Sequence, residues 1–133
     1  MRCRMCRLFL TLLVFTTLAS CRESVDEAQM VAQTAQLYYE SLLQGRYDEF
    51  VGGLDSHVGA STAYDEQLVA NAKMFLEQQR TLKGGINSIA VVDAQIDKKR
   101  HTADAFLVFT YGDGSSEQVL VPMVERDGVW LMR

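Results

Sequence analysis

The residue types best suited to chemistry lie together in one polar segment, Asp55-Ser56-His57. These are the residue types of a hydrolase triad, but known triads draw their members from distant segments so that all three reach one reacting atom. Three neighbours on one loop cannot do so, and the segment is expected to be a polar loop between helices. His57 alone keeps a second reading, as a general base paired with Asp65 or Asp104. It is therefore the candidate catalytic residue.

Three other patterns of reactive side chains are weaker. His101 follows Lys98-Lys99-Arg100, a patch that could hold an anion or a lipid headgroup but is also typical of a solvated turn. The sequence has no His-x-x-x-His motif and no acidic loop with calcium spacing. It has no Gly-rich strand-to-helix motif for nucleotides either. Neither a metal nor a cofactor is expected.

The N-terminal segment has the pattern of a secretory signal. Arg2, Arg4 and Arg7 precede an apolar run over residues 8–18. A helix of that length covers only about half of a ~30 Å hydrocarbon core, which favours a signal h-region over a transmembrane anchor. Cys3 and Cys6 have redox or metal spacing, but they fall in this segment and are removed with it.

The four residues Leu18-Ala19-Ser20-Cys21 resemble a bacterial lipobox. The resemblance implies cleavage before Cys21, a diacylglyceryl group on its sulfur and a further acyl chain on its amine. Two or more chains make membrane residence stable. We therefore expect a signal peptide over 1–20, a lipid-anchored tether over 21–26 and a single domain over 27–133. The domain would lie outside the cytoplasm, anchored to a membrane of the bacterial envelope.

The charge balance excludes one class of partner. From Cys21 onward the chain carries 10 Lys or Arg against 17 Asp or Glu. An acidic body argues against nucleic acid, whose phosphates need a basic face. With 48% hydrophobic residues and a single proline, this body is expected to fold rather than to be disordered.

The periodicity of apolar residues predicts helices first and strands afterwards. An apolar stripe at helical spacing runs from Ala28 to Leu43, and a short second helix carries Tyr47 to Leu54. A capping box at Thr62 to Asp65 opens a third helix. Beyond it the period becomes two, which predicts strands over 86–97, 102–111, 117–125 and 129–132. The fold class is therefore α+β, with three N-terminal helices on one face of a four-stranded antiparallel sheet.

Several short motifs resemble those of a known group. They are Gly84-Gly85-Ile86, Tyr111-Gly112-Asp113-Gly114-Ser115, Asp127-Gly128-Val129-Trp130 and the segment from Tyr38 to Tyr47. Together they are similar to small bacterial lipoproteins that carry the domain of unknown function 4878. The resemblance implies a cystatin-like cone of the nuclear transport factor 2 superfamily, in which a curved sheet wraps a long helix. That superfamily holds isomerases, dehydratases, cyclases and binding modules, so the fold does not choose a function.

Two sets of apolar side chains bear on function. The first set could line a pocket in the cone or form its core, and core packing is the favoured reading; its members are Tyr38, Tyr39, Tyr64, Phe75, Phe109, Tyr111 and Trp130. The second set lies on the opposite face of the sheet, where an exposed apolar patch marks a contact site; its members are Phe106, Val108, Leu120 and Val124. We expect this face to meet a second copy or an envelope protein.

The sequence thus favours a lipid-anchored binding or interaction module without catalytic activity. The alternative is a small enzyme of isomerase, dehydratase or cyclase type that uses His57 and a tyrosine. A cone filled by side chains would favour the module. An open cavity that holds a carboxylate would favour the enzyme.

Overall fold

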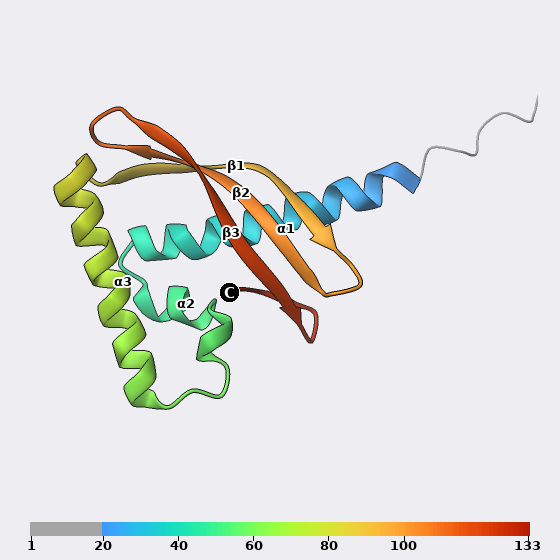
Figure 1. Cartoon of the computed structure of the whole chain (residues 1–133), viewed down its shortest axis with the longest axis horizontal. Coiled ribbons are helices and arrows are strands. Elements are labelled where there is room, and N and C mark those ends of the chain that lie inside the picture. Colours follow the sequence, from blue (N-terminus) through green and yellow to red (C-terminus); the bar gives the residue numbers. More distant parts are fainter. Residues whose placement is uncertain (1–19) are drawn as a thin grey trace, which may run out of the picture.

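The computed structural model describes the backbone of residues 20–133 and the side chains of residues 27–133. Helices come first and strands follow, with a short 3-10 turn, η1, between the second and third helices (Figure 1). The elements are α1 (Ser20–Leu43), α2 (Tyr47–Gly52), η1 (Asp55–His57), α3 (Thr62–Lys83), β1 (Ile86–Asp97), β2 (Thr102–Tyr111), β3 (Ser116–Arg126) and β4 (Val129–Met132). This order confirms the predicted α+β fold class.

The long helix α1 crosses one face of the sheet (Figure 1). Its buried positions recur at helical spacing, because Val31, Ala32 and Ala35 are fully buried in one cluster with residues of the strands. Leu42, further along the helix, is also fully buried. The helix begins at Ser20, so residues 21–26, which were expected to form a tether, have helical backbone continuous with α1. Their polar composition does not stop the helix, since Arg, Glu and Asp are compatible with its first turns. The predicted signal peptide, residues 1–20, lies almost wholly outside the described residues.

The third helix begins one residue earlier than a cap on Thr62 would require. Ser61 is the N-cap, and its hydroxyl accepts the backbone N–H of Tyr64 at 3.2 Å. Thr62 is the first residue inside the helix, so the predicted capping box is wrong in register. At the other end Gly84 adopts a φ of 77°, which the left-handed cap of this helix requires.

The strands form one antiparallel meander in the order β1-β2-β3-β4. Three strands have the predicted bounds, and β3 is one residue longer at each end than predicted. A register shift between Val91 and Asp93 marks a bulge in β1 where it pairs with β2. The tight turns fall at the predicted Asp-Gly positions, with φ values of 84° at Gly114 and 80° at Gly128.

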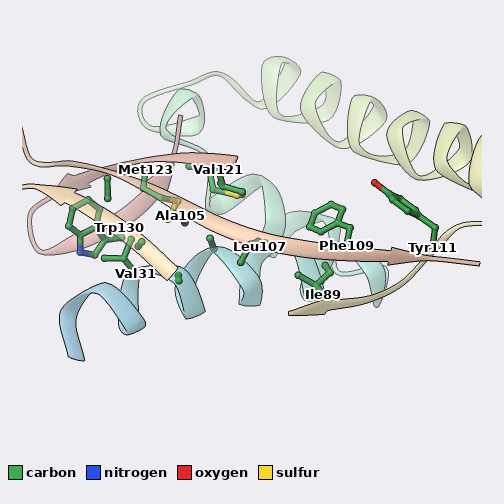
Figure 2. Close-up of a cluster of buried hydrophobic side chains, with 14 residues drawn as sticks. Val31, Ile89, Ala105, Leu107, Phe109, Tyr111, Val121, Met123 and Trp130 are labelled. Atoms are coloured by element: carbon green, nitrogen blue, oxygen red, sulfur yellow. The ribbon is translucent and has the colours of Figure 1, made fainter. Parts of the chain in front are cut away.

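The core lies between α1 and the inner face of the sheet (Figure 2). The odd positions of β2, from Ala103 to Tyr111, are buried, as the alternation in the sequence predicts. Val121 and Met123 of β3 lie beside them, and Trp130 of β4 is only 5% exposed. The phenol of Tyr38 on α1 donates a hydrogen bond to the backbone carbonyl of Trp130 at 2.9 Å. The last strand is therefore fixed to the first helix.

A close approach at Gly53 completes this junction. A Cβ atom at Gly53 would lie under 3.0 Å from the ring of Tyr38. The carbonyl of Gly53 accepts the N–H of Met132 at 2.7 Å, and Leu54 forms a bridge with Met132. The segment after α2 thus packs beside β4 only because residue 53 lacks a side chain.

Gly53→Ala is expected to lower the free energy of unfolding by about 1–3 kcal/mol, because the added methyl group must displace the ring of Tyr38. Gly52→Ala is the matched control, since nothing lies within 4 Å of a Cβ there. The control is expected to give no loss, and a gain of up to about 1 kcal/mol from the reduced entropy of the unfolded chain. Urea unfolding of both variants measures the difference. Equal stabilities would contradict the close packing at Gly53.

Candidate functional site

The aromatic residues considered as pocket lining are mostly core. Phe109, Tyr111 and Trp130 are buried, with exposures of 5% or less. Tyr38, Tyr39 and Phe75 are half-buried and pack against the same core. Tyr64 differs, because it is 42% exposed in the first turn of α3 and does not belong to the core cluster. Six of the seven aromatic residues therefore lie in or against the core cluster, and Tyr64 lies outside it.

The centre of the cone holds an aromatic stack. The ring of Tyr39 lies 5.5 Å from that of Phe50 and 5.2 Å from that of Phe109, centroid to centroid. Interplanar angles of 60° and 68° make both contacts edge-to-face, the arrangement that aromatic quadrupoles favour. Burial raises the pKa of the Tyr39 phenol above its ordinary value. These three rings therefore belong to the core or pack against it.

A polar cluster lies at the end of the inner face, where β2 turns into β3. The Tyr111 hydroxyl donates to the Glu117 carboxylate, and Lys83 of α3 lies 3.2 Å from the same carboxylate. The Lys83 ammonium is also 4.2 Å from the centre of the Tyr111 ring, a cation–π contact. The two hydrogen bonds hold the pKa of Glu117 below its ordinary value. Burial, and then the bond to Glu117, raises the pKa of Tyr111 well above its usual range.

Sequence reasoning missed Lys83 and Glu117 as partners of Tyr111. Only the strand register reveals the contact between Glu117 and Tyr111. It pairs Glu117 with Phe109 and so places Glu117 on the inner face. Two backbone hydrogen bonds between the end of α3 and the β2–β3 turn bring Lys83 close to Glu117. The carbonyl of Lys83 accepts the N–H of Asp113, and that of Gly85 accepts the N–H of Gly112 at 2.8 Å. A Cβ atom at Gly112 would lie under 3.0 Å from Gly84, so the two glycine motifs are a structural contact.

The residues of the Asp55-Ser56-His57 segment diverge. Asp55 binds Arg126 of β3, and this ion pair holds the pKa of Asp55 below its ordinary value. His57 turns instead toward α3, where its Nδ1 lies 2.7 Å from the Asp65 carboxylate. The two side chains are 38% and 30% exposed. Of the two partners considered for His57, the structure brings Asp65 to it. Asp104 lies on the outer face of the sheet, opposite Pro122.

A shallow pocket of about 430 Å³ opens between the α1–α2 turn and α3. It is lined by residues 45–49 together with Val69 and Lys73, and none of the seven aromatic candidates contributes to it. Two of its charged groups form an ion pair, because Arg46 and Glu49 lie 2.8 Å apart. Hydrogen bonds from Ser41 and Arg46 lower the pKa of Glu49. The pocket is a surface depression lined by both charged and apolar side chains.

Two searches of the described residues bear on other functions. No group of three or more His, Cys, Asp or Glu side chains among them could hold a metal ion. Within the same part of the chain, no helix is both long and apolar enough to span a bilayer.

Neither the family models nor the curated proteins give a match to this chain. Among solved structures, it is similar to a Campylobacter jejuni protein described as an NTF2-like transpeptidase. The two superpose with a TM-score of 0.57, over 74% of this chain and 92% of that chain. The chain has an NTF2-like fold. At 14% identity the likeness extends to the fold alone, and the activity in that description belongs to the other protein.

In this NTF2-like domain, the Glu117 cluster predicts a pH dependence of stability. Because the folded-state pKa of Glu117 lies below the ordinary value of 4.5, its carboxylate stabilises the fold above that pH. The contribution is lost as the pH falls through the lowered pKa. Glu117→Gln is therefore expected to be less stable than the parent at neutral pH, with the difference shrinking in acid. Urea unfolding at neutral pH and again in acid measures the difference in stability between the variant and the parent. Glu66→Gln, on an exposed part of α3, is the control. A difference independent of pH would contradict the assignment.

Proposed function

We propose that this chain is a lipid-anchored interaction module of a bacterial envelope, without catalytic activity. The observation that carries the proposal is the filled interior of the cone. Leu107 and Met123 are fully buried there, and Phe109 is 2% exposed. In the described part of the chain, every buried side-chain nitrogen or oxygen has a hydrogen-bond partner. An enzyme of this shape would need titratable groups that converge in an open cavity.

The proposed interaction surface is the outer face of the sheet. Phe106 and Leu120 pair across β2 and β3, and Leu120 is 50% exposed. Val108 and Val124 lie in the same two strands on the same face and are half-buried. Val92, at the bulge of β1, adds a further side chain that is 50% exposed. The packed helices lie against the inner face, and apolar side chains left exposed in this way typically mark a contact site.

A second copy of the chain is the proposed occupant of this face. Lipid-anchored copies share one membrane surface, which raises their effective concentration for each other. Two identical sheet faces can meet through a two-fold axis, so that each Phe106–Leu120 pair meets its own equivalent. An envelope protein of another kind is the competing occupant.

The anchor in this proposal is the lipidated Cys21. Its support is the lipobox of residues 18–21, which follows three arginines and an apolar run. The backbone of Cys21 belongs to the first turn of α1, with no loop between it and the domain. A lipid on this residue would therefore join the membrane directly to the helix that crosses the sheet.

The enzymatic alternative rests on the pair formed by His57 and Asp65. A carboxylate 2.7 Å from Nδ1 would orient the ring and leave Nε2 to act as a general base. The pair joins η1 to α3, and neither residue belongs to the core cluster of the cone. An isomerase, dehydratase or cyclase reading therefore needs a substrate site at this junction rather than inside the cone.

Cys21→Ala is expected to remove the protein from the membrane fraction or to leave an unprocessed precursor, because no sulfur remains for the lipid. Cys6→Ala is the control and is expected to give a mature protein identical to the parent. Fractionation and mass spectrometry of both variants measure the outcome. A Cys21→Ala protein that is processed and fractionates like the parent would overturn the lipid anchor.

Leu120→Asp is expected to abolish self-association, since pairing would then bury an unpaired charge at the centre of the interface. Because Leu120 is half exposed in the single domain, the variant should still fold. Leu82→Asp is the matched control, as Leu82 on α3 is 73% exposed and lies away from the sheet face. Chemical crosslinking in isolated membranes measures dimer content. If the parent protein gives no crosslinked dimer, the proposal that a second copy covers the outer face is wrong.

A further inference from the structure

The turn between β1 and β2 holds the most concentrated positive charge of the domain. Lys98, Lys99 and Arg100 are consecutive and exposed, with 73% of the Lys98 side chain and 83% of the Arg100 side chain open to solvent. They are three of the ten Lys or Arg residues that follow Ser20. The remaining seven are outnumbered by seventeen Asp or Glu, so the basic turn is a local exception on an acidic protein.

The basic turn lies at the same end of the molecule as the start of α1 (Figure 1). The Lys98 ammonium is 3.3 Å from the carboxylate of Glu27 on α1. Glu27 follows Cys21 by six residues in one continuous helix, which corresponds to about 9 Å along the helix axis. The basic turn therefore lies against the end of α1 that carries the proposed lipid.

The shape of the basic turn is fixed before any partner arrives. The Asp97 carboxylate accepts the backbone N–H groups of Lys99 and Arg100, each at 3.1 Å. The turn closes at His101, which adopts a φ of 53°. Asp97 and Glu27 offset part of the positive charge, and Asp127 lies in the neighbouring β3–β4 turn. Lys99 forms no ion pair with any residue of the described part from 27 onward.

We propose that the basic turn binds the phosphate groups of anionic phospholipids in the membrane that holds Cys21. This inference rests on the proposed lipid anchor. Such membranes attract clustered lysines and arginines close to the surface, and the attraction fades within a Debye length. The acidic remainder of the domain is repelled by the same surface. The anchor and the basic turn together would set the orientation of the domain, with the β1–β2 turn toward the lipid and α3 away from it.

The test uses the mature lipidated protein in vesicles of phosphatidylcholine, with or without phosphatidylglycerol. Once Cys21 is modified, a cysteine introduced at Gln95, close to the basic turn, is the only free thiol and takes a fluorescent donor. A headgroup-labelled lipid is the acceptor. A donor at Gln78 on α3 reports the far end of the domain. We expect energy transfer from position 95 to rise when phosphatidylglycerol is present, and transfer from position 78 to fall.

The decisive variant is Lys99→Gln with Arg100→Gln. A basic side chain near an anionic surface contributes about fivefold, so the ratio of docked to undocked protein should fall roughly 25-fold. The matched control is Lys73→Gln with Arg80→Gln, which removes the same charge from α3 and should leave the transfer unchanged. Raising the salt concentration to 1 M, where the Debye length is about 3 Å, should abolish the effect in the parent.

The possible outcomes distinguish a failure of this inference from a failure of the proposed lipid anchor. Protein that fails to float with either vesicle would overturn the lipid anchor and this inference with it. Protein that floats with both vesicles but shows no dependence on phosphatidylglycerol would overturn the orientation alone. The orientation would also be overturned if the two double variants, one in the basic turn and one on α3, changed the energy transfer equally. Loss of docking in inorganic phosphate, but not in chloride of equal ionic strength, would point to a free-anion site instead of a membrane surface.

Discussion

The packing of α1 against the inner face of β2 is the interaction on which the rest of the structure depends. Every second residue of β2, from Ala103 to Tyr111, is buried and belongs to one core cluster with Val31 of α1. The helices lie on this one side of the sheet, so the alternate residues of β2, including Phe106 and Val108, have no helix above them. The same alternation that buries the inner positions therefore places Phe106 and Val108 on the outer face, together with Asp104 and two threonines. The buried inner positions and the partly exposed outer positions are two consequences of one constraint.

The polar groups near the cone are already paired with one another. Glu117 accepts hydrogen bonds from Tyr111 and Lys83, which join α3 to the β2–β3 turn. Asp55 holds Arg126, joining η1 to the end of β3. Such pairs fix one element to another. Exposed pairs of this kind add little stability individually, so their main effect is on geometry.

The strands were the most predictable part of the fold. The alternation of apolar residues and the Asp-Gly turns carry local information, and β1, β2 and β4 begin and end where the sequence predicts. Helix ends were less predictable. Ser61 and Thr62 are both good caps, and sequence alone does not decide which hydroxyl meets the N–H of Tyr64. The polar start of α1 was likewise read as a tether, because it has no apolar stripe to mark it as helical.

Contacts between distant segments were beyond reach of the sequence. Tyr38 meets Gly53 and the carbonyl of Trp130, and nothing local to any of the three residues announces the other two. His57 was a partial exception. The sequence offers it two partners, Asp65 and Asp104, and the structure brings Asp65 to His57 and places Asp104 on the outer face of the sheet. For the seven aromatic candidates the sequence favours core over pocket, and six of them lie in or against the core cluster.

The central claim is that side chains, and not a ligand, fill the cone. Native mass spectrometry of the mature protein, purified from its own membranes, tests it most directly. The account predicts the mass of the lipidated chain or of its dimer, with no further small molecule bound. A small molecule retained in one-to-one ratio, and lost when Phe109 is changed to a bulkier tryptophan, would contradict the account and favour a ligand-binding or enzymatic cone.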